Sequence, residues 1–406
     1  MEHTIVGIDL GSSKVCTLVG EVDDEDKTSI IGVGMAPSRG VRKGAVVNVV
    51  EATAAITNSV SKAEHTSGYK IERAYISLSG THIASLNSRG VVGISRRERG
   101  IAVEDVDRVV EAARAVAVPH NQEVVHVIPR DYIVDGQSGV RDPIGMHGFR
   151  LEVETHIITG ATTSIQNLVQ CVEAAGVGVD ELVASGVAAG GAVLTDTERE
   201  MGVVLADIGA GTTDISIFID GSVWHTVVLG VGGEYITGDI AIGLRLQPNV
   251  AEQIKIQHGH SRAKQVSPDE RISVAPHGED VPQVIPRWRL AEIIEARVEE
   301  ILLMIQQEIK RSGYDGLLPA GVVLTGGTAE LVGIGELGRD IFGLPVRIGT
   351  PRALHGLVDM VSKPAQAVGV GLMGWGGTVS TRPQLRKSDP GNSRRFLGWL
   401  RAFLPG

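Results

Sequence analysis

A glycine-rich stretch near the middle of the chain constrains the fold more than any other feature. An apolar run over residues 201–206 leads into Asp207-Ile208-Gly209-Ala210-Gly211-Thr212-Thr213-Asp214, and an alternating, β-branched run over 215–219 follows. This order predicts a β-hairpin with a glycine turn. Because glycine has no Cβ, backbone N–H groups in such a turn can approach an anion closely. Taken alone, the pattern also fits an ordinary tight turn.

A second copy of this design lies near the N-terminus. An apolar strand over residues 4–8 leads into Asp9-Leu10-Gly11-Ser12-Ser13, and the outgoing strand begins by Val15. Two such hairpins, roughly 200 residues apart in one chain, predict two similar half-domains that face one ligand. An aspartate ends the incoming strand of each hairpin, where its carboxylate can hold Mg²⁺ through water. We therefore predict that Asp9 and Asp207 form a metal site.

A third stretch completes the set. A buried strand over residues 322–325 opens into Gly326-Gly327-Thr328. With the three stretches in this order, the chain resembles the actin-like ATPase superfamily, which includes actin, MreB, DnaK-type chaperones, sugar kinases and FtsA. The two hairpins resemble its phosphate-1 and phosphate-2 loops, and the third stretch resembles its adenosine loop. The resemblance implies an α/β, ribonuclease H-like fold of two lobes, with ATP and Mg²⁺ in the cleft between them.

The resemblance also implies which residues bind the nucleotide. Those expected around the phosphates are Gly11, Ser12, Ser13, Lys14, Gly209, Gly211, Thr212, Thr213, Gly232 and Gly233. Those expected around the adenosine are Glu252, Lys255, Gly326, Gly327 and Thr328. The spacing of Glu252 and Lys255, three residues apart on one helix face, also fits a solvated ion pair. No residue stands out as a general base, so the resemblance implies ATP binding with at most slow hydrolysis.

Residues 83–158 narrow the resemblance to one family. Stretches in and beside this segment resemble the small inserted α+β subdomain, 1C, of FtsA. They include Ser79-Gly80, Ala112-Ala113-Arg114, Pro129-Arg130-x-Tyr132, Pro143-Ile144-Gly145-Met146 and Arg150-Leu151-Glu152. FtsA is the bacterial cell-division actin homologue that ties the FtsZ ring to the membrane. Actin and MreB carry a different insertion elsewhere, so we expect residues 83–158 to form subdomain 1C.

The same resemblance divides the rest of the chain. Its implied boundaries are 1–82, 159–199 and 352–376 for subdomain 1A, 200–238 and 306–351 for subdomain 2A, and 239–305 for subdomain 2B. Subdomain 2B is the family's docking surface for the FtsZ tail, and Arg297 and Glu300 match its contact positions. Both residues also fit the solvated face of an amphipathic helix over 289–310. Residues 38–44 predict a basic loop punctuated by glycines.

The end of the chain changes composition twice. Residues 377–392 are rich in Pro, Gly, Ser and charge without periodicity, which is typical of a flexible linker. Residues 393–406 predict an amphipathic helix, in which basic flanks and aromatic anchors favour a membrane interface. Its apolar arc is Phe396, Leu397, Trp399, Leu400, Phe403 and Leu404, and its basic residues are Arg394, Arg395 and Arg401. FtsA proteins carry the same arrangement; packing of this helix back onto the protein body is the alternative.

The composition of the chain limits which partners and which cellular location can be expected. A net charge of −10 disfavours nucleic acid as a partner. The two cysteines, Cys16 and Cys171, sit in apolar patterns and predict a chain without disulfides, as in a reducing cytoplasm. No apolar run reaches the roughly 18 residues of a membrane span, and no signal peptide precedes the first strand. By resemblance we expect a peripheral protein on the cytoplasmic face of the membrane at the septum. Its expected partners are the FtsZ tail, further copies in a filament, the membrane and other division proteins.

Three rival functions share the same core. A PilM-like pilus-assembly ATPase resembles FtsA in subdomain 1C, but would recruit an inner-membrane peptide and lack the terminal helix. A sugar kinase belongs to a different functional class and would need a catalytic aspartate and sugar-binding insertions that no segment here resembles. MreB is disfavoured by residues 81–158.

Overall fold

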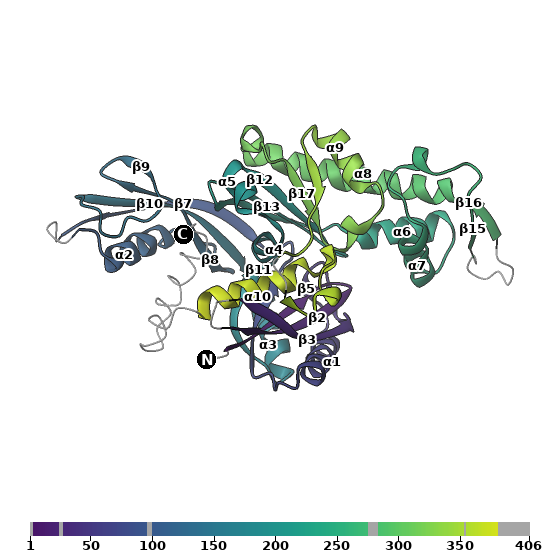
Figure 1. Ribbon diagram of the computed structural model, residues 1–406, viewed down its shortest axis with the longest axis horizontal. Coiled ribbons are helices and arrows are strands. Elements are labelled where there is room, and N and C mark those ends of the chain that lie inside the picture. The colour runs from purple at the N-terminus through teal and green to yellow at the C-terminus, as the bar shows by residue number, and fades with distance from the viewer. Residues whose placement is uncertain (1–2, 24–26, 96–99, 275–282, 353–354, 381–406) are drawn as a thin grey trace.

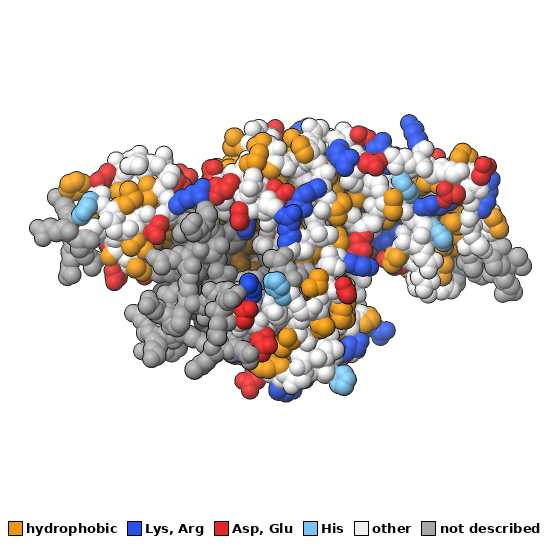
Figure 2. All heavy atoms as spheres, viewed as in Figure 1, with side chains coloured by type: hydrophobic (Ala, Val, Ile, Leu, Met, Phe, Trp, Pro, Cys, Tyr) orange, Lys and Arg blue, Asp and Glu red, His pale blue; other side chains and the backbone are white. Residues whose placement is uncertain are grey.

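The computed structural model describes residues 3–23, 27–95, 100–274, 283–352 and 355–380. Two lobes face each other, and a smaller subdomain projects from one end of the pair (Figure 1). Acidic and basic side chains are intermixed over the visible face of both lobes, as Figure 2 shows. The helix predicted over 393–406, with its apolar and basic residues, lies outside the described residues.

The first lobe is built on a mixed sheet in the order β11-β6-β1-β2-β3-β19. Strands β1 (His3–Leu10) and β2 (Lys14–Val22) form the predicted hairpin, and β3 (Thr28–Pro37) extends it into an antiparallel meander. Strands β6 (Arg73–Leu78) and β11 (Gly178–Ala184) continue it in parallel, and the short β19 (His355–Gly356) joins the far edge. Helices α1 (Val49–Ser67) and α3 (Thr162–Ala174) pack together against this lobe, and α10 (Ala367–Ser380) packs against β1 (Figure 1).

The second lobe repeats this topology with the order β14-β13-β12-β17-β18. Strands β12 (Val203–Ile208), β13 (Thr213–Ile219) and β14 (Ser222–Leu229) form the meander, and β17 (Val322–Thr325) and β18 (Val346–Ile348) add in parallel. The helices of this lobe are α6 (Gly233–Gly243), α7 (Pro248–His258), α8 (Arg287–Ser312) and α9 (Ile334–Phe342). A two-stranded sheet of β15 (Arg271–Val274) and β16 (Gln283–Pro286) lies beside them. The predicted pair of similar half-domains is therefore confirmed at the level of strand order and direction.

Glycine and alanine allow the two lobes to approach closely. Helix α4 (Ser185–Val193) contacts β12 and β13 of the second lobe and α10 of the first. A Cβ added at Gly190 would lie 2.4 Å from Cζ of Phe218, and one at Gly371 would lie 1.9 Å from the Ala188 carbonyl oxygen. The small residues of this region thus serve close packing. Helix α5 (Asp196–Met201) then leads the chain into the second lobe.

The projecting subdomain has its own sheet, in the order β7-β10-β8-β9, and its own apolar core. Its elements are β7 (Ala84–Gly93), α2 (Val103–Arg114), β8 (Gln122–Val134), β9 (Gln137–Val140) and β10 (Arg150–Ala161). The sequence predicts an interruption at Pro129, but β8 runs through it, because a bulge in the register beside Asp131 absorbs the proline. The subdomain also touches the second lobe: the Ser85 hydroxyl donates to the Thr226 carbonyl at 2.6 Å.

Helix α10 continues to Ser380, four residues into the range expected to be linker. Glycines explain the extension, because a Cβ at Gly376 would lie 2.4 Å from the Ile5 side chain and a larger residue would lift the helix off β1. Within the described ranges, no helix combines the length and apolar character needed to cross a bilayer.

Candidate functional site

The two glycine turns have the same geometry in both lobes. In the first, Leu10 pairs with Val15, and the Gly11 N–H donates to the Lys14 carbonyl at 3.0 Å. In the second, Ile208 pairs with Thr213, and the Gly209 N–H donates to the Thr212 carbonyl at 2.9 Å. Each turn therefore closes four residues with one backbone hydrogen bond.

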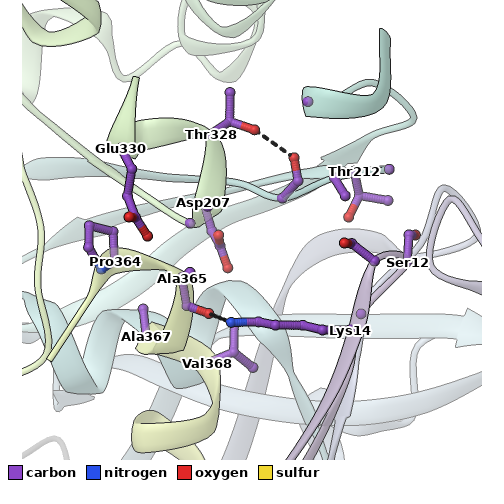
Figure 3. Close-up of a pocket in the computed structure, with 18 of the residues that line it drawn as sticks. Ser12, Lys14, Asp207, Thr212, Thr328, Glu330, Pro364, Ala365, Ala367 and Val368 are labelled. Carbon is purple, nitrogen blue, oxygen red and sulfur yellow. Dashed lines mark hydrogen bonds between the residues drawn. The ribbon is translucent and has the colours of Figure 1, made fainter. Parts of the chain in front are cut away.

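Both turns line one cavity of about 410 Å³ between the lobes (Figure 3). This volume lies in the usual range for a small-molecule site. Most of the predicted residues line it; they are Asp9, Gly11, Ser12, Ser13, Lys14, Asp207, Gly209, Gly211, Thr212, Gly233, Glu252, Lys255, Gly326, Gly327 and Thr328. The turns nearly touch, since a Cβ at Gly211 would lie 2.5 Å from Oγ of Ser12. Only glycine at this position lets the loops approach so closely.

Two predicted phosphate residues do not line the cavity. Thr213 is fully buried and its hydroxyl donates to the Val231 carbonyl at 2.8 Å, because strand alternation turns its side chain away from Thr212. A Cβ at Gly232 would lie 2.6 Å from the carbonyl oxygens of both Gly209 and Ala210. These two residues pack behind the second turn, and neither lines the cavity.

Three carboxylates converge at the inner end of the cavity. Asp207 and Asp214 are directly paired across the β12–β13 hairpin, and Asp9 occupies the position in the first lobe that corresponds to Asp207. Burial, reinforced by the charges of Asp214 and Asp9, raises the pKa of Asp207 well above its usual value. Burial also raises the pKa of Asp214 to about 7, against the effect of its hydrogen bonds from Ser79 and Thr212. These carboxylates repel one another and favour a bound cation.

The donor set fits a hydrated magnesium ion. Among the residues that the structure describes, no three His, Cys, Asp or Glu side chains lie close enough together to bind a metal directly. Magnesium usually keeps several of its waters and takes only one or two carboxylates. The mutually repelling aspartates of the two turns can accept hydrogen bonds from such waters. That Asp9 and Asp207 hold the metal through water stays a prediction from the sequence.

Lys14 connects the first turn to residues 365 and 366. Its Nζ donates to the Ala365 carbonyl at 2.7 Å and to Oε1 of Gln366 at 2.9 Å (Figure 3). These acceptors belong to a 3₁₀ turn (Pro364–Gln366) whose Pro364 carbonyl accepts from the Gly326 N–H at 3.3 Å. The turn therefore joins the first lobe to the stretch predicted as an adenosine loop. Lys14 also partly offsets the charge of Asp9 and Asp207.

Helix α7 and the 326–328 stretch form the outer end of the cavity. Lys255 is only 9% exposed, and its Nζ donates to the Gly233 carbonyl at 3.1 Å, to Thr237 Oγ1 at 2.9 Å and to Glu252 Oε2 at 2.6 Å. The Glu252–Lys255 pair is thus no ordinary solvated pair. The Thr328 hydroxyl donates to the Gly209 carbonyl at 3.0 Å (Figure 3). The apolar side chains beside them are Ile256, Leu331 and Val332.

Arg297 and Glu300, the predicted partner residues, lie on α8 away from this cavity. The Arg297 guanidinium donates to both carboxylate oxygens of Asp239 on α6, at 2.5 and 3.1 Å, and to Glu300 at 2.5 Å. Arg297 therefore already ties α8 to α6 within the chain, while Glu300 is more than half exposed.

Sequence reasoning missed several cavity residues. Asp214, Ser79, Ser185 and Glu330 all line the cavity. Asp214 could have been found from the sequence. In a hairpin that pairs Ile208 with Thr213, the next pair is Asp207 with Asp214. The sequence carried no such signal for Ser79. It follows strand β6 of the first lobe, and only the assembled fold brings its hydroxyl to 2.8 Å from Asp214.

Comparison with known proteins identifies the family. The family model described as cell division protein FtsA matches residues 204–371, and that of the SHS2 domain inserted in FtsA matches residues 80–159. The chain is 44% identical to cell division protein FtsA of Pseudomonas aeruginosa, over 97% of this chain and 92% of that protein. It is 37% identical to the Escherichia coli K12 protein of the same name, over 98% and 97% of the two chains.

Solved structures confirm the predicted fold. A PilM–PilN type IV pilus biogenesis complex aligns with a TM-score of 0.64 at 16% identity, covering 91% of this chain and 97% of that one. MreB5 of Spiroplasma citri bound to ADP aligns with a TM-score of 0.55 at 14% identity, covering 91% and 94%. The architecture is therefore that of the actin-like ATPases. Together with the identities to the curated proteins, it establishes that this chain is a member of the FtsA family of cell division proteins.

Proposed function

We propose that the cavity binds ATP with Mg²⁺ and that the bound nucleotide holds the two lobes together. The observation that carries this proposal is the pair of equivalent glycine turns facing one cavity, with Asp207 and Asp214 buried and Asp9 half-buried beside them. Exposed backbone N–H groups suit phosphate oxygens, and clustered carboxylates suit the accompanying cation. The related MreB5 structure, which was solved with ADP, shares this fold.

The chain's own groups then have distinct tasks. Backbone N–H groups of both turns, with the Ser12 and Thr212 hydroxyls, orient the phosphates, and the aspartates hold the waters of the cation. The cation, when bound, offsets the combined negative charge of phosphates and carboxylates. Glu252 and Lys255 on α7 face the ribose, and Gly326 and Gly327 leave room for the base beside Leu331. A ligand that contacts both lobes favours the closed arrangement, because it binds that arrangement more tightly.

Calorimetry on the Asp207→Ala protein tests this assignment. We expect the variant to lose measurable Mg-ATP binding, because it removes a carboxylate from the cation site. Asp269→Ala is a matched control, since Asp269 is exposed and far from the cavity lining. Wild-type affinity in the Asp207→Ala protein would reject the site.

We further propose that the chain links FtsZ filaments to the membrane as part of a filament of its own copies. Family membership supports a cell-division role. The exposed Glu300 beside Arg297 supports α8 as the surface for the FtsZ C-terminal tail. A fluorescent FtsZ-tail peptide should bind the wild type and bind Glu300→Ala at least fivefold more weakly. Lys310→Ala, at the far end of the same helix, should bind normally. No binding to the wild type would instead favour a pilus-type partner.

The membrane part of the proposal rests on residues 393–406, with their aromatic arc and arginines. The full chain should co-sediment with anionic liposomes, and a chain ending at residue 392 should not. A single short helix binds weakly, so filament formation should strengthen attachment through avidity. Equal sedimentation of both proteins would refute membrane attachment through residues 393–406.

A further inference from the structure

A small hairpin in the first lobe reaches across the phosphate end of the cleft. It consists of β4 (Val41–Arg42) and β5 (Ala45–Val46), with Lys43 and Gly44 as its tip. Both tip residues have positive φ, 49° and 74°, as a tight two-residue hairpin turn requires. The tip is held in place, because the Gly44 N–H donates to Oγ of Ser12 at 3.4 Å, and a Cβ at Gly44 would lie 2.7 Å from Cα of Gly80.

The tip also contacts the second lobe. A Cβ at Gly211 would lie 3.2 Å from the Lys43 backbone nitrogen, and one at Gly230 would lie 3.6 Å from Cδ of Lys43. The Lys43 side chain then extends to α6, where its Nζ lies 5.2 Å from the centre of the Tyr235 ring. This is the distance of a cation–π interaction. Lys43 therefore belongs to one lobe and places its charge on an aromatic ring of the other.

A second cation lies near the Tyr235 ring. The guanidinium of Arg297 on α8 lies 5.7 Å from the centre of the same ring. Arg297 is also bound to Asp239 and Glu300. Tyr235 is in the first turn of α6, two residues after Gly233, whose N–H donates to the Gly209 carbonyl at 2.9 Å. The Tyr235 ring thus contacts a cation of the first lobe and a cation of α8, and it lies two residues from the glycine that binds the second turn.

We propose that Lys43 is a positioning residue whose contact with Tyr235, here called the strap, holds the two lobes together over a bound nucleotide. The Tyr235 ring, which both Lys43 and Arg297 approach, then links this closure to the α8 face that carries Arg297 and Glu300. The inference rests on the proposed nucleotide function of the cleft. Its physical basis is that Lys43 can reach Tyr235 only when the lobes are close. A ligand that favours the closed arrangement and the Lys43–Tyr235 contact therefore stabilise each other.

The first test measures Mg-ATP affinity by calorimetry. A buried or half-buried cation–π contact corresponds to about a fivefold change in affinity. Lys43→Met, which keeps the apolar stem, and Tyr235→Leu, which keeps all charges, should each weaken binding by about this factor. The double variant should be no weaker than either single one. Tyr235→Phe, which keeps the ring, and Arg42→Met, which removes the neighbouring exposed cation, should stay within about twofold of the wild type.

The outcomes separate the strap from the nucleotide site. Weak binding by Lys43→Met but normal binding by Tyr235→Leu would overturn the strap, because Lys43 would then act on the ligand directly. Equal affinity in all the proteins would also overturn it while leaving the nucleotide site intact. Failure of the wild type to bind would instead refute the proposed function of the cleft. Melting curves confirm that each variant is folded.

The second test concerns the link to α8. Hydrogen exchange is followed over residues 289–303 with and without saturating Mg-ATP. Nucleotide should slow exchange there in the wild type and in Arg42→Met, and should have less effect in Lys43→Met at equal saturation. Full protection of this segment in saturated Lys43→Met would refute the link between the strap and α8.

Discussion

Replacing Asp214 by asparagine should make the empty protein more stable. Asp214 is 5% exposed, lies opposite Asp207 and accepts a hydrogen bond from Ser79 at 2.8 Å. Asparagine keeps an acceptor for Ser79 and removes a carboxylate charge from a site that already holds two others. The variant therefore isolates the electrostatic cost of the cluster with little change in shape.

The magnitude follows from the pKa of Asp214, which burial raises from 3.8 to about 7. This rise in pKa corresponds to a ceiling of about 4 kcal/mol, since each tenfold change in an equilibrium constant is worth about 1.36 kcal/mol. Relaxation and water entry lower this, so we expect about 2 kcal/mol at pH 8. Because the folded pKa is raised, the stability contributed by this carboxyl group is fully present below about pH 4. It is lost as the pH rises through about 7. The advantage of the variant should therefore grow between pH 5 and pH 8.

Thermal unfolding without nucleotide or divalent cation measures the effect. For a chain of this length, about 2 kcal/mol corresponds to a rise in the melting temperature of about 2–4 °C. Asp269→Asn, an exposed carboxylate change, should shift the melting temperature by less than about 1 °C at either pH. Added Mg-ATP should stabilise the wild type more than Asp214→Asn. Destabilisation of the variant at pH 8, or an advantage that does not grow with pH, would refute the reasoning.

Three further predictions concern the interface between the lobes and the outer end of the cleft. Gly190→Ala should lower stability by about 1–3 kcal/mol in denaturant unfolding, because its Cβ would lie 2.4 Å from the Phe218 ring; Gly191→Ala, with nothing within 4 Å, should not, and equal loss in both would contradict the packing argument. Glu198→Gln should cost about 2 kcal/mol, since it breaks the bidentate ion pair with Arg347 at 2.5 and 2.7 Å. Burial opposes ionisation of Glu198, but Arg347 and Thr195 outweigh it and lower its pKa to about 2; the difference from the wild type should therefore be constant above about pH 5 and shrink as the pH falls from 4.5 towards 2. Lys255→Met should weaken Mg-ATP binding about tenfold or more in calorimetry, because Gly233, Thr237 and Glu252 lose their common donor. Normal affinity would show that these hydrogen bonds do not support the nucleotide site.

Local sequence patterns predict most of the elements of this fold. The two glycine hairpins, the strand over 322–325 and the amphipathic helix expected over 289–310 all occur close to where the sequence places them. The exceptions are places where tertiary packing overrides a local signal. Pro129 lies inside a continuous strand because a bulge accommodates it, and residues 377–380 continue α10 because their glycine-rich neighbours fit against β1.

The candidate site also has one part that the sequence determines and another that only the tertiary structure decides. The chain by itself determines the two turns, since aspartate, glycine and small polar residues at fixed spacing set a hairpin that closes with one backbone hydrogen bond. Only the tertiary structure decides which side chains share the cavity. Strand alternation turns the Thr213 side chain into the core and the Thr212 side chain toward the cavity. The return of the chain to the first lobe brings Ala365 to Lys14, 351 residues away in the sequence. The approach of the two lobes brings Lys43 to Tyr235. Such contacts depend on how two sheets approach each other, a distance that no local pattern of residues encodes.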